Sequence, residues 1–280
     1  MLAVPREALT ARLAAAGLDW IIPQWPVPSA VQAFVTTRNG GISTGESASL
    51  DLGGAKMAHA QPETVDAIAE NRRRVEAFLP AKPTWLEQVH GADVVTIAQD
   101  DRASKAFNAQ HGDRSRPPRG DAAVTRDANV VLAVRVADCL PVLFTDREAS
   151  AVAVAHAGWR GLAAGVLENT VAAMRCAPER IVAWLGPAIG QSAFEVGADV
   201  HDAFVQADRA SAAAFVPGRP GKWHADLDAL ARLRLARAGV TSIHGGGMCT
   251  LSDPARFFSF RRAGTAGRMA AVIWHAAQPS

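Results

Sequence analysis

The stretch VADCLPVLFTDREASAVAVAHAGWRG, residues 136–161, decides how this chain folds and where its chemistry lies. It contains two apolar runs of the kind found in β-strands, at 140–144 and 151–155. Cys139 precedes the first run, and His156 ends the second run just before a Gly-Trp-Arg-Gly turn. Side chains at strand ends beside a tight turn can be held rigidly and still reach a cleft. The stretch therefore predicts strands that carry an active site.

The order of elements around this stretch predicts an α+β fold. Strands are expected in close succession at 121–125, 130–136, 141–145 and 151–156, and such short connections favour antiparallel hairpins over βαβ crossovers. Because helical and strand patterns are interspersed without strict alternation, we expect a large mixed sheet or a pair of sheets. Further strands are expected at 31–37, 93–98, 181–185, around Ser242, 257–260 and 268–274, and helices at 7–16, 62–79, 162–174, 200–207 and 226–238.

The composition excludes several classes of function. The formal net charge of +2 is too small to indicate binding to nucleic acid or to an anionic membrane. No apolar run approaches the ~20 residues that span a bilayer, and the N-terminus shows no secretory signal. The three cysteines are widely spaced and form no C-x-x-C motif, which predicts a reducing, cytoplasmic compartment.

The domain organisation is expected to be simple. We find no internal repeat and no linker, so a single domain over residues 1–280 is expected. The segment 101–119 is polar and rich in Arg, Ser and Pro, without hydrophobic periodicity. Such a segment lacks the apolar residues that would offset the entropy of ordering it, so we expect a mobile surface loop there.

Three side chains could form a metal site. His90, Cys139 and His156 are all expected near strand ends, next to or close to Gly or Pro. Two imidazoles and a thiolate suit Zn²⁺, and three protein ligands leave the fourth position open, as in catalytic zinc sites. Because spacing along the chain carries almost no information here, a second interpretation stays open: two hydrogen-bonded histidines and one buried, inert cysteine.

The same residues could instead provide a nucleophile. Cys139 would attack the substrate with His156 or His90 as its base, and Asp138 could orient the histidine. This hypothesis requires the sulfur within hydrogen-bond reach of an imidazole. Asp138 could also simply cap a turn, since consecutive strand residues point to opposite faces.

Arginines at turns are candidates for binding an anionic substrate. Arg38 follows a strand at a Gly-Gly turn, Arg160 lies in the turn before a helix, and Arg262 follows the expected strand at 257–260. A guanidinium near a turn or a helix N-terminus can bind phosphate or carboxylate through two hydrogen bonds. A single arginine is more often a solvated charge, so this prediction requires two or more of them in one pocket.

Several common signatures are missing from the chain. There is no H-E-x-x-H helix, no Walker-type phosphate loop, no zinc-deaminase H-x-E with P-C-x-x-C, and no G-x-S-x-G elbow. Only eight histidines occur, and none forms an H-x-H pair. Multicopper oxidases need many more histidine ligands, so copper is disfavoured as the cofactor.

Taken together, the motifs resemble a known family. The resemblance extends over about residues 30–275, and the blocks VADCLPV and AVAHAGWRG are its most specific parts. They are similar to the purine nucleoside phosphorylase family typified by YfiH, also labelled laccase-domain, multicopper polyphenol oxidase, DUF152 and peptidoglycan editing factor PgeF. The matching blocks are TTRNGGISTG (36–45), WLEQVHG (85–91), GDAAVT (120–125), VADCLPV (136–142), AVAHAGWRG (153–161), LGPAIG with FEVG (185–197) and FFSFRRAG with GRMAAVIW (257–274).

The resemblance implies a fold and a chemistry. The fold would be an α/β/β/α sandwich with mixed, largely antiparallel sheets, holding one catalytic zinc ion through His90, Cys139 and His156. The activity would be phosphorolysis of adenosine, inosine, guanosine and methylthioadenosine, with adenosine deamination at the same site. The substrates would be a nucleoside and phosphate, with no nucleic acid or membrane partner. The alternatives that the family labels suggest are a Cys/His amidase acting on peptidoglycan precursors and a copper-dependent laccase.

The resemblance and the residues together assign provisional roles. Arg38 is the first choice for binding phosphate, with Arg160 and Arg262 as further candidates, and Asp138 or the zinc-bound water could handle the proton. One departure is the segment LDLGGAKMAH, residues 50–59, where the family often has N-L-G-x-H-x-G-D. This difference, together with the long insert at 101–119, could alter the rim of the pocket.

Overall fold

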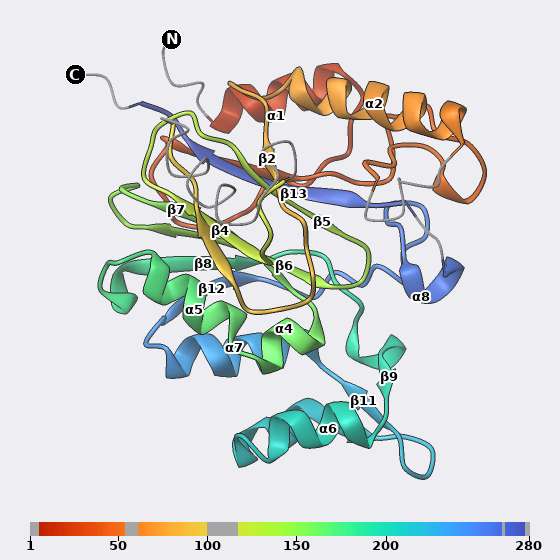
Figure 1. Cartoon of the computed structure of the whole chain (residues 1–280), viewed down its shortest axis with the longest axis vertical. Helices are drawn as coiled ribbons and strands as arrows, with labels where there is room; N and C mark the ends of the chain where they lie inside the picture. The colour runs from red at the N-terminus through yellow and green to blue at the C-terminus, as the bar shows by residue number, and fades with distance from the viewer. Residues whose placement is uncertain (1–5, 54–60, 100–116, 265–266, 278–280) are drawn as a thin grey trace.

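The structure is a computed structural model that describes residues 6–53, 61–99, 117–264 and 267–277. Most of the loop predicted at 101–119, and most of the departing segment at 50–59, lie outside these residues. Two β-sheets form the centre of the molecule, and helices cover the outer face of each (Figure 1). The predicted α/β/β/α sandwich is confirmed.

The larger sheet has six strands in the order β12-β8-β6-β7-β4-β3. Its central pairs are antiparallel, while both edge strands pair in parallel, so the sheet is mixed as predicted. The central strands β6 and β7 are buried along their whole length, which agrees with their nearly unbroken apolar runs. The six strands are β3 (Val94–Thr96), β4 (Ala122–Thr125), β6 (Leu140–Asp146), β7 (Val152–Ala157), β8 (Ile181–Leu185) and β12 (Ser242–Gly245).

The smaller of the two central sheets has four strands in the order β1-β13-β5-β2. It packs on the larger sheet through a buried apolar layer in which Val134, Leu143, Val154 and Ile273 all take part. Such face-to-face burial of two sheets is the main source of stability in a sandwich. Its strands are β1 (Val31–Val35), β2 (Thr84–Trp85), β5 (Leu132–Val136) and β13 (Met269–His275).

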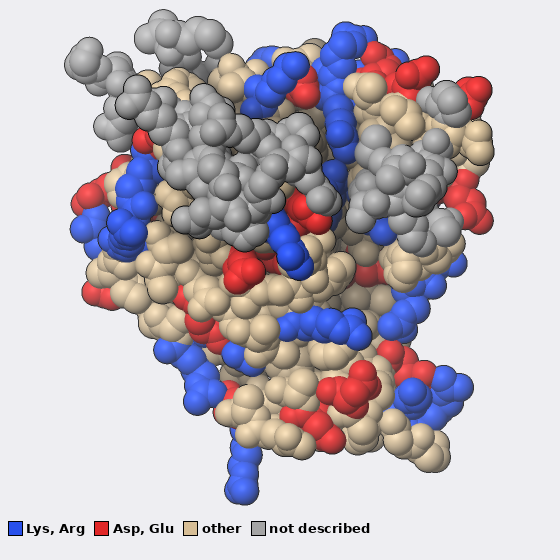
Figure 2. Space-filling view, in the orientation of Figure 1, with Lys and Arg blue, Asp and Glu red and all other residues tan. Residues whose placement is uncertain are grey.

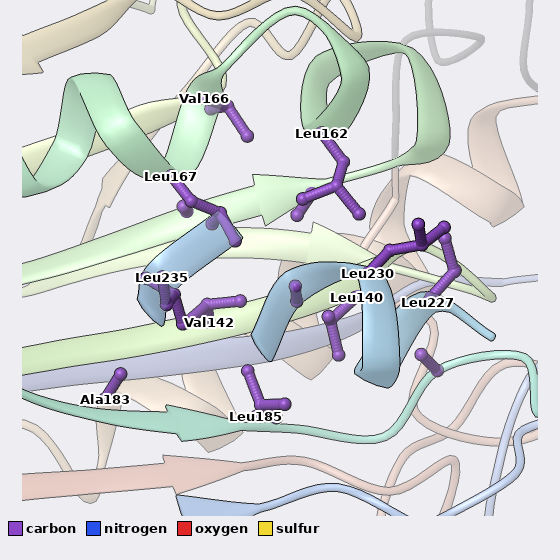
Figure 3. Close-up of a cluster of buried hydrophobic side chains, with 14 of the residues drawn as sticks. Leu140, Val142, Leu162, Val166, Leu167, Ala183, Leu185, Leu227, Leu230 and Leu235 are labelled. Atoms are coloured by element: carbon purple, nitrogen blue, oxygen red, sulfur yellow. The ribbon is translucent and has the colours of Figure 1, made fainter. Parts of the chain in front are cut away.

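Helices cover the two outer faces. Helices α1 (Arg6–Ala15) and α2 (Pro62–Glu76) lie on the four-stranded sheet (Figure 1). On the six-stranded sheet lie α4 (Trp159–Ala163), α5 (Val166–Ala173) and α7 (Leu227–Arg237). Figure 3 shows side chains of these three helices meeting those of β6 and β8 in one buried cluster, which includes Leu140, Leu162, Leu167, Leu185 and Leu230.

A small lobe extends below this helical layer in Figure 1. It contains α6 (Ala198–Val205), which was expected at 200–207, and a three-stranded sheet of order β10-β11-β9. The sequence analysis did not predict this sheet. Its strands are β9 (Glu195–Val196), β10 (Phe215–Pro217) and β11 (Trp223–Ala225). They are only two or three residues long, too short to show a hydrophobic alternation.

The prediction of successive hairpins is only partly confirmed. Strands β6 and β7 form an antiparallel hairpin, and β4 pairs antiparallel with β7. Strand β5, which lies between β4 and β6 in the sequence, instead joins the other sheet. Its residues are apolar on both faces, with Leu132 facing the six-stranded sheet and Ala133 facing the helical layer. Since either sheet buries both faces of a strand, hydrophobicity alone could not decide between them.

Two further local predictions were wrong. The helix expected at 162–174 is divided into α4 and α5 by Gly165, whose φ of 94° lies in the left-handed region. The segment 257–260 is not a strand, although Phe257 and Phe258 are buried. There the side chain of Ser259 accepts a hydrogen bond from the backbone of Arg262 and begins the short helix α8 (Phe260–Ala263).

Candidate metal centre and cavity

Three predicted ligands meet at the end of the six-stranded sheet. The ligand atoms of His90, Cys139 and His156 all lie within 4.8 Å of one another. Cys139 directly precedes β6, and His156 lies in the neighbouring strand β7, so the β6–β7 pairing brings these two together. His90 comes from the loop between β2 and β3, and its ring centroid is 4.8 Å from that of His156. This is the arrangement that a metal site requires.

Asp121 holds this arrangement in place, and the sequence analysis missed it. Its fully buried carboxylate accepts a hydrogen bond from His156 Nδ1 at 2.8 Å. It also accepts backbone N–H bonds from Val89, His90 and Gly91 at 3.1, 2.9 and 2.7 Å. One carboxylate therefore fixes both the ring of His156 and the loop that carries His90, as outer carboxylates do in many zinc sites. The motif GDAAVT, with an acid at the start of a buried strand, was the available signal.

The hydrogen bonds also set the protonation of Asp121. Burial opposes its ionisation, but the bonds from His156 and Gly91 outweigh burial, so the pKa of Asp121 lies below its usual value. With Nδ1 of His156 bound to this carboxylate, Nε2 is the nitrogen left to face the cluster.

The cluster favours an ionised thiol. Burial alone would raise the pKa of Cys139, but the charge and hydrogen bonds of His156, followed by those of His90, lower it to about 6. Burial likewise opposes the charging of His156, yet Cys139 and Asp121 raise its pKa to about 9. Both shifts favour a protonated His156 beside a thiolate when no metal is bound. A metal cation fits this position, because it would take over the role of that positive charge.

The ligands form part of the wall of a cavity of about 730 Å³. Figure 2 shows this face of the molecule hollowed between the positions of α4 and α8, with Lys and Arg side chains along the rim. The wall combines apolar and basic groups with the acidic side chains of Glu87 and Asp138. The apolar members include Trp159, Ile189, Phe194, Leu227 and Phe260, and the basic members are Arg72, Arg135, Arg160, Arg261 and Arg268.

Comparison with known proteins identifies the family. The sequence pattern of the family described as multi-copper polyphenol oxidoreductase laccase matches residues 32–276. The chain is 48% identical to a purine nucleoside phosphorylase of Pseudomonas aeruginosa over 91% of this chain and 98% of the relative. It is also 48% identical to the purine nucleoside phosphorylase YfiH of Escherichia coli, with the same coverage of 91% and 98%. The chain belongs to the YfiH-type laccase-domain family.

Two solved structures share the fold. A Neisseria meningitidis protein of the DUF152 family is 45% identical and superposes with a TM-score of 0.81, over 92% of this chain and 100% of that one. YlmD of Geobacillus stearothermophilus is 34% identical, with a TM-score of 0.77 over 89% and 93% of the two chains.

The family's name refers to several copper ions, but the described part of this chain does not contain enough clustered metal-binding side chains to hold several ions. There, His90, Cys139 and His156 form the one group of three or more metal-binding side chains that lie close enough together. Multicopper oxidases combine a mononuclear copper with further coppers that need additional histidines. One cluster of three ligands supports a single ion.

Within the same described residues, every helix is too short or too polar to cross a membrane.

Two of the predicted anion-binding arginines are used elsewhere. The Arg38 guanidinium donates to the backbone carbonyls of Ala48 at 2.7 Å and Pro254 at 3.1 Å, and lies over the Phe258 ring. Arg262 donates to the carbonyls of Thr250 and Phe257 at 3.2 and 2.6 Å. Neither side chain is among the described residues that line the cavity. The side chains of Arg38 and Arg262 therefore connect loops through hydrogen bonds to backbone carbonyls. The structure does not support a phosphate site at either residue.

The third arginine and Asp138 do line the cavity. The guanidinium of Arg160 lies 4.3 Å from the ring centroid of Trp159. Asp138 accepts hydrogen bonds from Thr250 Oγ1 at 2.6 Å, from Ser259 Oγ at 3.0 Å and from the backbone N–H of Arg261 at 2.7 Å. Asp121, rather than the predicted Asp138, thus takes the position that orients His156. A catalytic role for Asp138 stays a prediction.

The cluster is closely confined by Gly158, which gives a first testable prediction. A Cβ atom at this position would lie 2.9 Å from Cys139 Sγ and 3.1 Å from His90 Cδ2, although the φ of −65° suits any residue. We expect Gly158→Ala to displace these ligands and to lower metal affinity by ~10–100-fold, the range seen when the immediate surroundings of a metal site are disturbed. Competition with a chromogenic chelator measures this change.

Gly91→Ala is the matched control for that substitution. A Cβ at Gly91 would lie 3.6 Å from both Asp121 Oδ2 and Val89 Cγ2, which is ordinary van der Waals contact. This variant should bind metal like the wild type. Equal metal affinity in the Gly158→Ala and Gly91→Ala variants would show that the cluster is not confined as the structure indicates.

Proposed function

We propose that this chain is a zinc-dependent purine nucleoside phosphorylase that also deaminates adenosine. The observation that carries the proposal is the His90–Cys139–His156 cluster in the wall of a cavity that is lined by apolar, basic and acidic side chains. Relatives that are named purine nucleoside phosphorylases match 91% of the chain at 48% identity, which supports the same activity.

The donor set supports zinc as the ion. One thiolate and two imidazoles are ligands that zinc accepts in tetrahedral sites, and three protein ligands leave one position for a small molecule. When bound at such a site, zinc acts as a Lewis acid and lowers the pKa of water, which is the chemistry that deamination needs. We also propose a cytoplasmic location, because Cys139, Cys176 and Cys249 are all free thiols.

The chain's own side chains would bind and orient the nucleoside. Trp159, Phe194 and Phe260 line the cavity and offer aromatic surface to a purine ring. Asp138 lines the same cavity and remains our candidate for exchanging a proton with the substrate. Arg160 is exposed and lines the same cavity, and its guanidinium remains our candidate for binding a phosphate oxygen of the substrate.

The activity can be tested by following adenosine with and without inorganic phosphate. We expect adenine and ribose 1-phosphate only when phosphate is present, and inosine in both conditions. Reversed-phase chromatography separates the base from the nucleosides. Dialysis against a chelator should abolish both reactions, and added Zn²⁺ should restore them. The absence of every product in both conditions would refute the proposal.

A second candidate is supported by one specific observation. Cys139, His156 and Asp121 stand in the order of nucleophile, base and orienting acid that cysteine hydrolases use, and the pKa of Cys139 is lowered to about 6. An amidase acting on peptidoglycan precursors would use this arrangement. The two functions respond oppositely to metal removal, because a chelator frees the thiolate for attack but abolishes zinc-dependent chemistry.

A further inference from the structure

The loop of residues 86–91, which we call the His90 loop, carries the metal ligand that the fold constrains least. Cys139 directly precedes β6 and His156 lies in β7, and these two strands are paired, whereas His90 lies outside the strands and is exposed. The φ of His90 is 61°, in the left-handed region that a residue with a side chain adopts only when its surroundings hold it there. The position of the third ligand therefore depends on the contacts that anchor its loop.

One set of contacts fixes the His90 loop to the six-stranded sheet. Asp121, which directly precedes β4, accepts hydrogen bonds from the N–H groups of residues 89–91. The backbone of Glu87 donates to the carbonyl of Pro118 at 2.8 Å and accepts from the N–H of Gly120 at 3.2 Å. Since Pro118, Gly120 and Asp121 lead into β4, these contacts all act from the side of the six-stranded sheet.

The side chain of Gln88 fixes the same loop to the four-stranded sheet. Its amide N–H donates to the backbone carbonyl of Arg135 at 2.8 Å, and its amide oxygen accepts from the backbone N–H of Arg135 at 2.9 Å. Strand β2 pairs with β5 at Leu132 and Ala133 and ends before it reaches Arg135. The Gln88 amide therefore takes the place of the next strand residue and satisfies both backbone groups of Arg135.

A glutamine suits this position because its amide can donate and accept at the same time. Arg135 returns a contact to the loop, since its Nη2 donates to the carbonyl of Leu86 at 2.8 Å. Gln88 also lines the cavity, but it does not belong to the group of metal-binding side chains. Any effect of Gln88 on the metal would therefore pass through the loop to His90.

We propose that Gln88 is a positioning residue for the metal ligand His90. The His90 loop is held between the two sheets, by Asp121 on one side and by Gln88 on the other. Without the two bonds of Gln88, the attachment to β5 would be weakened, and His90 would spend less time beside Cys139 and His156. The inference rests on the zinc centre of the proposed function and adds a residue that determines how well this centre is assembled.

The first test is the affinity of the full-length protein for Zn²⁺. Gln88→Met keeps the length of the side chain and removes both hydrogen bonds. We expect this variant to bind Zn²⁺ ~10–100-fold more weakly, the range for residues that orient a metal ligand, as measured by competition with a chromogenic chelator. In a protein that already carries His90→Ala, the same substitution should change the affinity by less than about twofold, because the ligand to be positioned is gone.

Cobalt(II) provides a second readout, which a general loss of stability would not change. Co²⁺ bound at this centre should show a charge-transfer band from the thiolate of Cys139 and visible bands that depend on the number and arrangement of the ligands. We expect Gln88→Met to keep the thiolate band. Its visible bands should shift towards those of the His90→Ala variant.

Gln24→Met is the matched control. Gln24 is exposed, donates to the carbonyl of Ile22 at 3.3 Å and is not among the described residues that line the cavity. The same substitution there should leave the Zn²⁺ affinity and the Co²⁺ spectrum unaltered. If circular dichroism shows that Gln88→Met fails to fold, Gln88→Asn carries the test. Its amide is one methylene shorter and cannot make both bonds from the same loop position, so a smaller loss in the same direction is expected.

The outcomes separate this inference from the proposed function. If Gln88→Met keeps the Zn²⁺ affinity and the Co²⁺ spectrum of the wild type, the role of Gln88 is wrong and the proposed function stands. An equal loss of affinity with and without His90→Ala would also overturn the inference, since Gln88 would then act on the fold and not on His90. If the wild type binds Zn²⁺ but forms no product from adenosine, the proposed function is wrong, and the Zn²⁺ affinities still decide the role of Gln88.

Discussion

Cys139→Ser is expected to remove the bound metal and to lower phosphorolysis and deamination by more than ~100-fold, since even groups outside the ligand shell contribute ~10–100-fold. The physical reason is the charge of the ligand. The thiol of Cys139 has a pKa of about 6, so it is ionised at neutral pH, whereas a serine hydroxyl stays protonated and binds zinc weakly. Metal content measured by mass spectrometry and initial rates with adenosine check this prediction.

Cys176→Ser is the control for that experiment. Cys176 is half-buried at the edge of the core behind α5 and is not among the residues that line the cavity. The control should retain metal and activity. A Cys139→Ser protein that keeps a full complement of metal would show that the sulfur is not a ligand.

Asp121→Asn is expected to cost both stability and metal affinity. The Asp121 carboxylate accepts four hydrogen bonds, from His156 Nδ1 and from the N–H groups of residues 89–91. An amide has only one acceptor oxygen, so buried donors would lose their partners, at ~1–3 kcal/mol each. We expect the free energy of unfolding to fall by ~2–4 kcal/mol and metal affinity to fall by ~10–100-fold. Denaturant unfolding and chelator competition measure the two effects.

The pH dependence of stability provides a second readout for Asp121. Its pKa in the folded protein is lowered, so its contribution to stability is fully present above the pKa of an unfolded aspartate. That contribution is lost as the pH falls towards the folded value. Asp121→Asn should therefore flatten the acid side of the stability profile. Asp127→Asn, which changes a carboxylate that accepts from Gln99 N–H outside the cavity, should not.

The sequence allowed the ligands to be predicted, but not the residue that organises them. Cys139 and His156 stand out because they interrupt apolar runs beside a tight turn, and His90 was a candidate with them because it precedes Gly91. Asp121 was overlooked because its carboxylate acts on backbone N–H groups and on a ring nitrogen, and the signal for these contacts in the sequence is no more than an acid at the start of a buried strand. Only the pairing of β4 with β7 shows that Asp121 and His156 are neighbours.

Of the three arginines predicted to bind an anion, Arg160 lines the cavity and Arg38 and Arg262 do not. Arg38 and Arg262 lie next to turns, as expected for binding residues, yet they donate to backbone carbonyls of nearby loops. Arg135 lies within an apolar strand, where a charge is usually excluded. The position of Arg135 is explained by the pairing of β5 within the four-stranded sheet. There the Arg135 side chain lies close to Arg72 of α2. Local patterns carry no information about such a change of sheet.

The β6–β7 pairing, in which Pro141 lies opposite His156, has a consequence for folding fidelity. In a sheet, a slip of one residue turns every side chain of the moved strand to the opposite face. Strands β6 and β7 are apolar on both faces, so hydrophobic burial alone would tolerate such a slip. A slipped chain, however, would carry His156 away from Cys139 and bind no metal. Because a ligand stabilises only the conformation that binds it, the ion would act as a selective stabiliser of the correct strand register.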